Sequence, residues 1–167
     1  MKSFCAGIFD IIQRSEKVVA VAMFVVMSAA LTADVIGREL VGQGIFGAAK
    51  FAVLAMIFCA MACFGICTAT GAHLRPRIAD QWIPKLIEPA VVRLGYFFSA
   101  TILFGITVSA CQAVAFSYVI EERDLALEWV IWPFQSILPI AFFLSGLRFL
   151  GYAVWPDLAP AEKRPVE

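Results

Sequence analysis

Three cysteines in the second apolar stretch of the chain have a spacing that could support thiol chemistry. Cys59, Cys63 and Cys67 recur every four residues, which in a helix aligns them along one stripe. A dithiol oxidoreductase usually carries a C-x-x-C pair or loop cysteines on the oxidising side of the membrane, and the sequence has no C-x-x-C. The small residues around the cysteines instead favour a packing stripe that lets two helices approach closely. We therefore expect packing, and a four-helix thiol redox membrane enzyme is the weaker alternative.

The one histidine, His73, is the other residue with catalytic potential. A metal site needs several ligands, and a haem bundle needs axial ligands within its helices, usually histidines. His73 falls at a predicted helix end with only Asp80 nearby, so we expect it to cap that end by hydrogen bonding to terminal carbonyls. The sequence therefore predicts that the protein is not an enzyme and has no catalytic, cofactor-binding, metal-binding or substrate-binding residue.

The elements that carry these residues are apolar enough to cross a membrane. The chain has 167 residues, of which 62% are hydrophobic and 16% charged, whereas soluble domains are about 45–50% apolar and about 25% charged. The excess falls in four blocks, each near the ~20 residues that a helix needs to cross the hydrocarbon layer. We predict an all-α integral membrane protein with one domain over residues 1–167. Its four spans cover approximately residues 18–36, 51–72, 94–120 and 129–147.

Basic residues near the helix ends predict the orientation, because cytoplasmic loops are enriched in Lys and Arg. The N-terminal segment, the second connection and the C-terminal tail hold ten of the thirteen Lys and Arg residues, and Arg148 is counted with the tail. The first and third connections hold the other three. Four spans place the first group on one side of the membrane, so we predict that both termini and residues 73–93 are cytoplasmic.

Two polar stretches on the predicted cytoplasmic side have amphipathic patterns. In each, apolar residues recur at helical spacing with charged residues between them, which is typical of helices in the membrane–water interface. We predict short interfacial helices at the N-terminus and between the second and third spans. In the second of these, GAHLRPRIADQWIPK, the candidate anchoring residues are His73, Arg75, Arg77, Trp82 and Lys85.

Two charges, Asp34 and Lys50, lie at the helix ends that flank the first connection. Charges near helix ends can reach the lipid headgroups, so we expect these two to snorkel or to pair at the interface. A contact to a partner protein is the alternative, because an intramembrane ion usually faces protein and not lipid.

The spans lack the sequence features of a transporter that works without other subunits. No span contains a row of acids or bases for a proton path, and no pair of Gly- or Pro-broken helices indicates a transporter's mid-membrane site. Pro133 and Pro139 could kink the fourth span. Since there is also no basic domain, we expect no nucleic-acid partner. The chain is therefore predicted to be a subunit of a larger membrane complex.

The order of motifs resembles the small permease subunit, DctQ-like, of tripartite ATP-independent periplasmic (TRAP) transporters. DVIGREL ends the first span, with Arg38 after the helix; CFGICTATGAHLRPRIADQWIP ends the second; and ALEWVIWPFQSILPIAFFLSGLRFL forms the last. The positions that match the family are His73, Trp82, Pro84, Pro139 and Arg148. The family usually has a Trp and one or two Glu at the start of the second span, where this chain has GIFGAAK. If those acids contact the partner, Lys50 would require a matching change on the partner surface.

The resemblance implies a static scaffold that packs against a large multi-span permease in the bacterial inner membrane. The large permease would hold the substrate and sodium sites, and a periplasmic solute-binding protein would deliver an organic acid for sodium-coupled symport. No cofactor is implied. Asp34, Arg38, Lys50 and Arg148 are then candidates for anchoring or subunit contact. The small membrane component of the tripartite tricarboxylate transporters, which also has four spans, is the alternative.

Overall fold

The computed structural model describes residues 2–71, 88–124 and 128–159. Its elements are α1 (Lys2–Val41), α2 (Ala48–Thr70), α3 (Glu88–Val119), α4 (Trp132–Gln135), α5 (Ile137–Val154) and a 3-10 helix, η2 (Pro156–Leu158). Four helical segments are long and apolar enough to cross a membrane: Cys5–Val41, Ala48–Thr70, Ala90–Val119 and Trp132–Val154. The predicted all-helical architecture with four candidate spans is therefore confirmed.

The first helix is longer than its predicted span. α1 runs without a break for 40 residues from Lys2 to Val41, so the N-terminal segment expected as a short interfacial helix is the first part of the spanning helix. At 1.5 Å per residue α1 measures about 60 Å, about twice the thickness of the hydrocarbon layer. A helix of this length must tilt or extend beyond the hydrocarbon. The interfacial position of its first turns stays a prediction.

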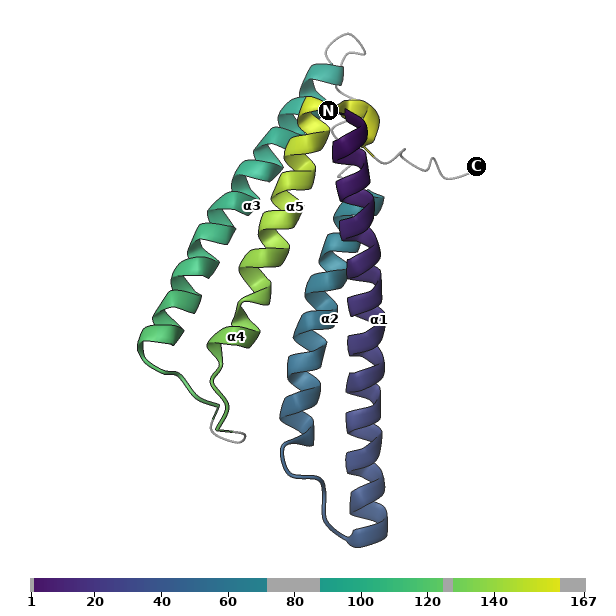
Figure 1. Ribbon diagram of the computed structural model, residues 1–167, viewed down its shortest axis with the longest axis vertical. Coiled ribbons are helices and arrows are strands. Elements are labelled where there is room, and N and C mark those ends of the chain that lie inside the picture. The colour runs from purple at the N-terminus through teal and green to yellow at the C-terminus, as the bar shows by residue number, and fades with distance from the viewer. Residues whose placement is uncertain (1, 72–87, 125–127, 160–167) are drawn as a thin grey trace, which may run out of the picture.

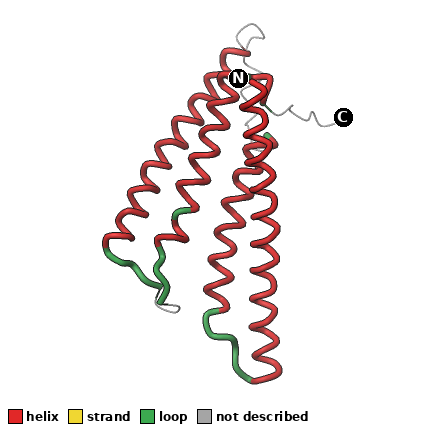
Figure 2. Tube along the Cα trace, in the orientation of Figure 1, coloured by secondary structure: helices red, strands yellow, loops and turns green. Residues whose placement is uncertain are grey.

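The last span consists of two helices that meet at Ser136. Pro139 lies in the first turn of α5 and has no amide proton, so it cannot donate to the carbonyl of Gln135 one turn earlier. The helix is interrupted at this point (Figure 2), and the Ser136 hydroxyl donates to the Trp132 carbonyl at 2.9 Å. α5 then continues to Val154, beyond the predicted end at residue 147.

The spanning helices form two antiparallel pairs (Figure 1). α1 packs along α2, α3 packs along α5, and α2 and α5 provide the main helix contact between the pairs. The pairs come together at the end where α1 begins and α5 finishes, and they diverge toward the opposite end (Figure 1). We call the first the closed end and the second the open end.

Small side chains form most of the buried apolar core. The buried hydrophobic residues are Ala20, Ala48, Ala52, Ala55, Ala62, Ala100, Leu103, Ala141 and Tyr152. Alanine lets helix backbones approach closely, which is how helices associate in a membrane where lipid is as apolar as leucine. Large apolar side chains are instead exposed on the outside of α1 and α3. The fold therefore has a narrow core and a broad apolar surface.

Candidate functional site

Five of the predicted site residues lie outside the described part of the chain. They are His73, Arg75, Arg77, Trp82 and Lys85. The predicted interfacial helix between the second and third spans lies there too, so its anchoring role stays a prediction.

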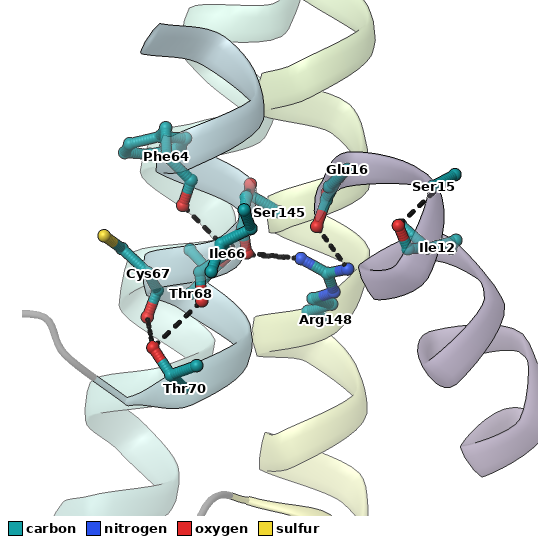
Figure 3. Close-up of polar contacts among 11 residues, drawn as sticks. Ile12, Ser15, Glu16, Phe64, Ile66, Cys67, Thr68, Thr70, Ser145 and Arg148 are labelled. Atoms are coloured by element: carbon teal, nitrogen blue, oxygen red, sulfur yellow. Dashed lines mark hydrogen bonds and ion pairs between the residues drawn. The ribbon is translucent and has the colours of Figure 1, made fainter. Parts of the chain in front are cut away.

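Arg148 is buried, although the sequence placed it with the tail charges after the last span. It lies within α5, and its side chain is 0% exposed. Its Nη2 donates to Oε2 of Glu16 on α1 at 2.8 Å, forming an ion pair. Its Nη1 donates to the carbonyl oxygen of Gly65 and, at 3.4 Å, to Oγ1 of Thr68, both on α2 (Figure 3). One guanidinium group therefore joins three helices.

Two hydroxyl groups complete this buried polar cluster. The Thr68 hydroxyl donates to the Gly65 carbonyl at 2.6 Å, and its oxygen lies 3.5 Å from the Ser145 hydroxyl oxygen on α5. Arg148, Thr68 and Ser145 are also the largest side chains that are fully buried in the described structure. The deepest part of the bundle is thus polar, whereas its surface is apolar. This distribution is expected where the surroundings are lipid, since polar groups within a membrane turn toward the protein interior.

Gly65 makes the approach of Glu16 to Arg148 possible. A Cβ atom added to Gly65 would overlap the carboxylate of Glu16, which lies directly against the α2 backbone. The carbonyl of the same residue accepts a hydrogen bond from Arg148. The sequence indicated Gly65 as part of a small-residue stripe, but it did not indicate which group required the space.

Aromatic rings cover the polar cluster on the side of the closed end. Tyr152 lies one turn after Arg148 and is 4% exposed. Its ring centroid lies 6.1 Å from that of Phe9 on α1 and 5.8 Å from that of Tyr96 on α3. α1 and α5 approach closely here, since a Cβ on Gly151 would lie 2.7 Å from Cζ of Phe9. The rings therefore separate the ion pair from that end of the bundle.

The electrostatics of this arrangement favour a structural role. Removing one partner of a buried ion pair typically costs about 3–5 kcal/mol, because the other charge is left uncompensated. The Arg148 Nε has no partner within the described residues, whereas its other nitrogens bind α1 and α2. The pair therefore links α1 to α5 through side chains that are largely removed from solvent.

The sequence suggested that Asp34 and Lys50 could pair with each other at the interface. In the structure they do not, because each has another partner. Asp34 is 7% exposed, and its Oδ2 accepts from Nη2 of Arg38, one turn later, at 2.6 Å. Its Oδ1 accepts from the backbone N–H of Ile45 at 2.8 Å. A Cβ on Gly44 would lie 2.7 Å from this oxygen. Asp34 therefore fixes the connection between α1 and α2.

Lys50 has its acidic partner on its own chain. Its Nζ lies 3.0 Å from Oδ2 of Asp124, in the connection between α3 and α4. Beside this pair the ring of Phe51 packs edge-on against Trp129, with centroids 6.4 Å apart. The side chains of Lys50 and Asp124 are 54% and 22% exposed, so this ion pair is much more exposed than the pair of Arg148 and Glu16. The basic residue at the start of α2 is thus matched within the subunit.

The cysteine stripe lies along α2 beside α1. The Cys59 thiol donates a weak hydrogen bond to the Ala20 carbonyl on α1 at 3.5 Å. Cys59 and Cys67 are half-buried and Cys63 is exposed. Ala55 and Ala62 of the same helix are buried. The contact at Cys59 agrees with the packing interpretation of the stripe.

Sequence comparison identifies the family. The family model described as "Tripartite ATP-independent periplasmic transporters, DctQ component" matches residues 27–159, which is most of the chain. The match includes Gly65 and Arg148 but begins after Glu16. No curated protein matches the sequence. The family is not enzymatic, and its members work in a complex with a large permease and a periplasmic binding protein. The match therefore favours the TRAP interpretation over the tricarboxylate-transporter and redox-enzyme alternatives. With its four candidate spans, the chain belongs to the DctQ family, the small membrane component of TRAP transporters.

Proposed function

We propose that this subunit is a static scaffold that packs against the large permease of its transporter. The observation that carries the proposal is the buried link from Arg148 on α5 to Glu16 on α1 and to the backbone of α2. An element that changes position during transport needs two arrangements of similar stability. A fully desolvated charge with partners on two other helices strongly favours one arrangement.

The family supports the remainder of the proposed role. The large permease holds the substrate and sodium sites and imports an organic acid, and a periplasmic protein delivers the acid. We place the complex in the bacterial inner membrane with the closed end toward the cytoplasm, because basic residues are concentrated on that side. Reporter fusions after residue 41 and after residue 159 test this orientation. The first is expected to report the periplasm and the second the cytoplasm, and the reverse result contradicts it.

A pair of substitutions tests the static role. Glu16→Leu leaves Arg148 buried without its carboxylate, and we expect the amount of folded subunit and of copurified large permease to fall strongly. The double variant Glu16→Leu, Arg148→Met removes both charges, and apolar replacement of a whole buried pair is often neutral or stabilising. We expect it to restore both the complex and solute uptake.

Asp10→Leu is the matched control, because it removes an exposed acid from the same helix. It should leave the complex intact. The decisive contrary result is a double variant that assembles normally but does not support uptake. Arg148 would then take part in transport, and the static role would be wrong.

A further inference from the structure

The outer side of α3 carries a line of exposed residues at helix-pairing spacing. The line, which we call the outer seam, consists of Leu94, Phe98, Thr101, Gly105, Val108, Gln112, Ala115 and Val119. Alternating steps of four and three residues keep such positions on one side of a helix, as in the contact line of a coiled coil. Leu103 is buried on the side of α3 that packs with α5. Gln112 follows nine residues later, which is two and a half turns, so the two side chains point in opposite directions. The outer seam therefore points away from the bundle.

Gln112 is the residue on this seam that lipid cannot satisfy. It lies within the candidate span Ala90–Val119, two turns or about 10 Å before the end of the helix. Its side chain is exposed, and its amide has no hydrogen-bond partner among the residues the structure describes. Hydrocarbon offers neither donor nor acceptor, so an amide that faces lipid within a span is unfavourable. Polar side chains in spans generally face protein.

Gly105 is a second feature without an explanation inside the subunit. A Cβ added there would meet nothing within 4 Å. By contrast, a Cβ on Gly146 of α5 would lie 3.1 Å from the ring of Phe104, so that glycine is required by a neighbour in the chain. Glycine weakens a helix relative to alanine. An exposed glycine between Thr101 and Val108 suits a surface that another helix backbone approaches closely.

The seam also differs from the exposed surface beside it. Ile102 and Ile106 of α3, which lie about 80° and 120° around the helix from Gln112, are large, apolar and exposed, as expected of residues that face lipid. The centre of the seam carries a hydroxyl, a glycine and an amide instead. A single polar residue on an otherwise apolar contact line can also fix the register of the two helices.

We propose that the outer seam of α3 docks a transmembrane helix of the large permease. That helix passes close to Gly105 and supplies a hydrogen-bonding side chain to the amide of Gln112. The inference rests on the proposed function, since the transporter complex provides the membrane-embedded protein partner. It adds to that function the face of the subunit that is used and the chemistry of the helix that binds there.

Copurification of the co-expressed large permease with the tagged subunit tests the seam. Gln112→Leu keeps a similar size but removes the amide, and we expect recovery of the permease per subunit to fall about 3- to 20-fold, the range for one interhelical hydrogen bond in a membrane. Gly105→Leu should reduce recovery at least as much by blocking close approach. Gly95→Leu is the matched control, because Gly95 is also exposed on α3, and a Cβ added there meets nothing within 4 Å, but it lies off the seam. It should retain full recovery.

A photo-crosslinking residue gives a second measurement that does not depend on weakening the complex. Placed at position 112, it should form an adduct with the large permease. Placed at the exposed Ile106, six residues away and about 120° around the helix, it should not. If the wild-type subunit recovers no permease at all, the proposed function itself fails and this inference fails with it. If the wild type recovers the permease and Gln112→Leu recovers it equally, the seam faces lipid and this inference alone is wrong. An adduct between two copies of the subunit at position 112 also overturns it.

Discussion

The two ends of the bundle are held together by ion pairs of different kinds. At the closed end Arg148 is 0% exposed and its partner Glu16 is 12% exposed, whereas at the open end the side chain of Lys50 is 54% exposed. The closed pair joins the first and last helices through the core. The open pair joins the start of α2 to a connection at the periphery. Since desolvation decides how much an unpaired charge costs, the same type of contact should be essential at one end and nearly dispensable at the other.

The largest effect is expected from Gly65→Ala. The added methyl group overlaps the Glu16 carboxylate and displaces it from Arg148. We expect a loss of unfolding free energy similar to that of breaking a buried pair, about 3–5 kcal/mol. Thermal unfolding of the purified subunit in mild detergent measures it.

Gly95→Ala provides the control for this change, since an added Cβ there meets no atom within 4 Å. Alanine is the better helix former by about 1 kcal/mol, so Gly95→Ala should be neutral or stabilising. The two identical substitutions are expected to act in opposite directions. A Gly65→Ala subunit as stable as wild type would show that the closed end tolerates rearrangement.

An intermediate effect is expected at Asp34. Asp34→Ala leaves Arg38 without its partner and removes the acceptor of the Ile45 N–H. A typical intramolecular hydrogen bond contributes about 0.5–1.5 kcal/mol to stability. Hydrogen exchange of the Ile45 amide should accelerate, and the connection between α1 and α2 should become more sensitive to protease. Asp34→Asn keeps a side-chain oxygen, so its Ile45 exchange rate should lie between those of the wild type and Asp34→Ala. If exchange is unchanged in Asp34→Ala, Asp34 does not fix the connection.

The smallest effect is expected from Lys50→Met. An exposed ion pair contributes about 0.2–1 kcal/mol, and salt screens it. The melting temperature of this variant should therefore stay close to that of the wild type, and the difference should shrink further at high ionic strength. A loss as large as that of Gly65→Ala would show that the open end depends on its ion pair as strongly as the closed end does.

Hydropathy was sufficient to predict the helices but not the buried cluster. The four apolar blocks correspond to the four candidate spans. Glu16 and Arg148, however, lie just outside the predicted spans 18–36 and 129–147, because a charge beside an apolar block is normally taken as its end. Their partnership joins positions 132 residues apart, and helical periodicity describes only neighbours within a few turns.

The charges at the open end were partly predictable. Asp34 and Arg38 are separated by four residues, a spacing at which helical side chains meet, so this pair was accessible from the sequence. The partner of Lys50 was not, because Asp124 is brought near only by the packing of the second helix pair. For the same reason the sequence could not show that Gln112 points away from the bundle and that Leu103 points into it.

The separation of Glu16 and Arg148 along the chain also has a consequence for synthesis. Glu16 leaves the ribosome 132 residues before Arg148, an interval of roughly 7–26 s at about 5–20 residues per second. During this time the first helix is complete, but its carboxylate has no guanidinium to neutralise it. The charge is compensated only when the last helix is made, so a truncated chain carries a defect in its first helix that the finished chain does not. The first helix therefore gains the partner of its carboxylate only after the last helix has been made.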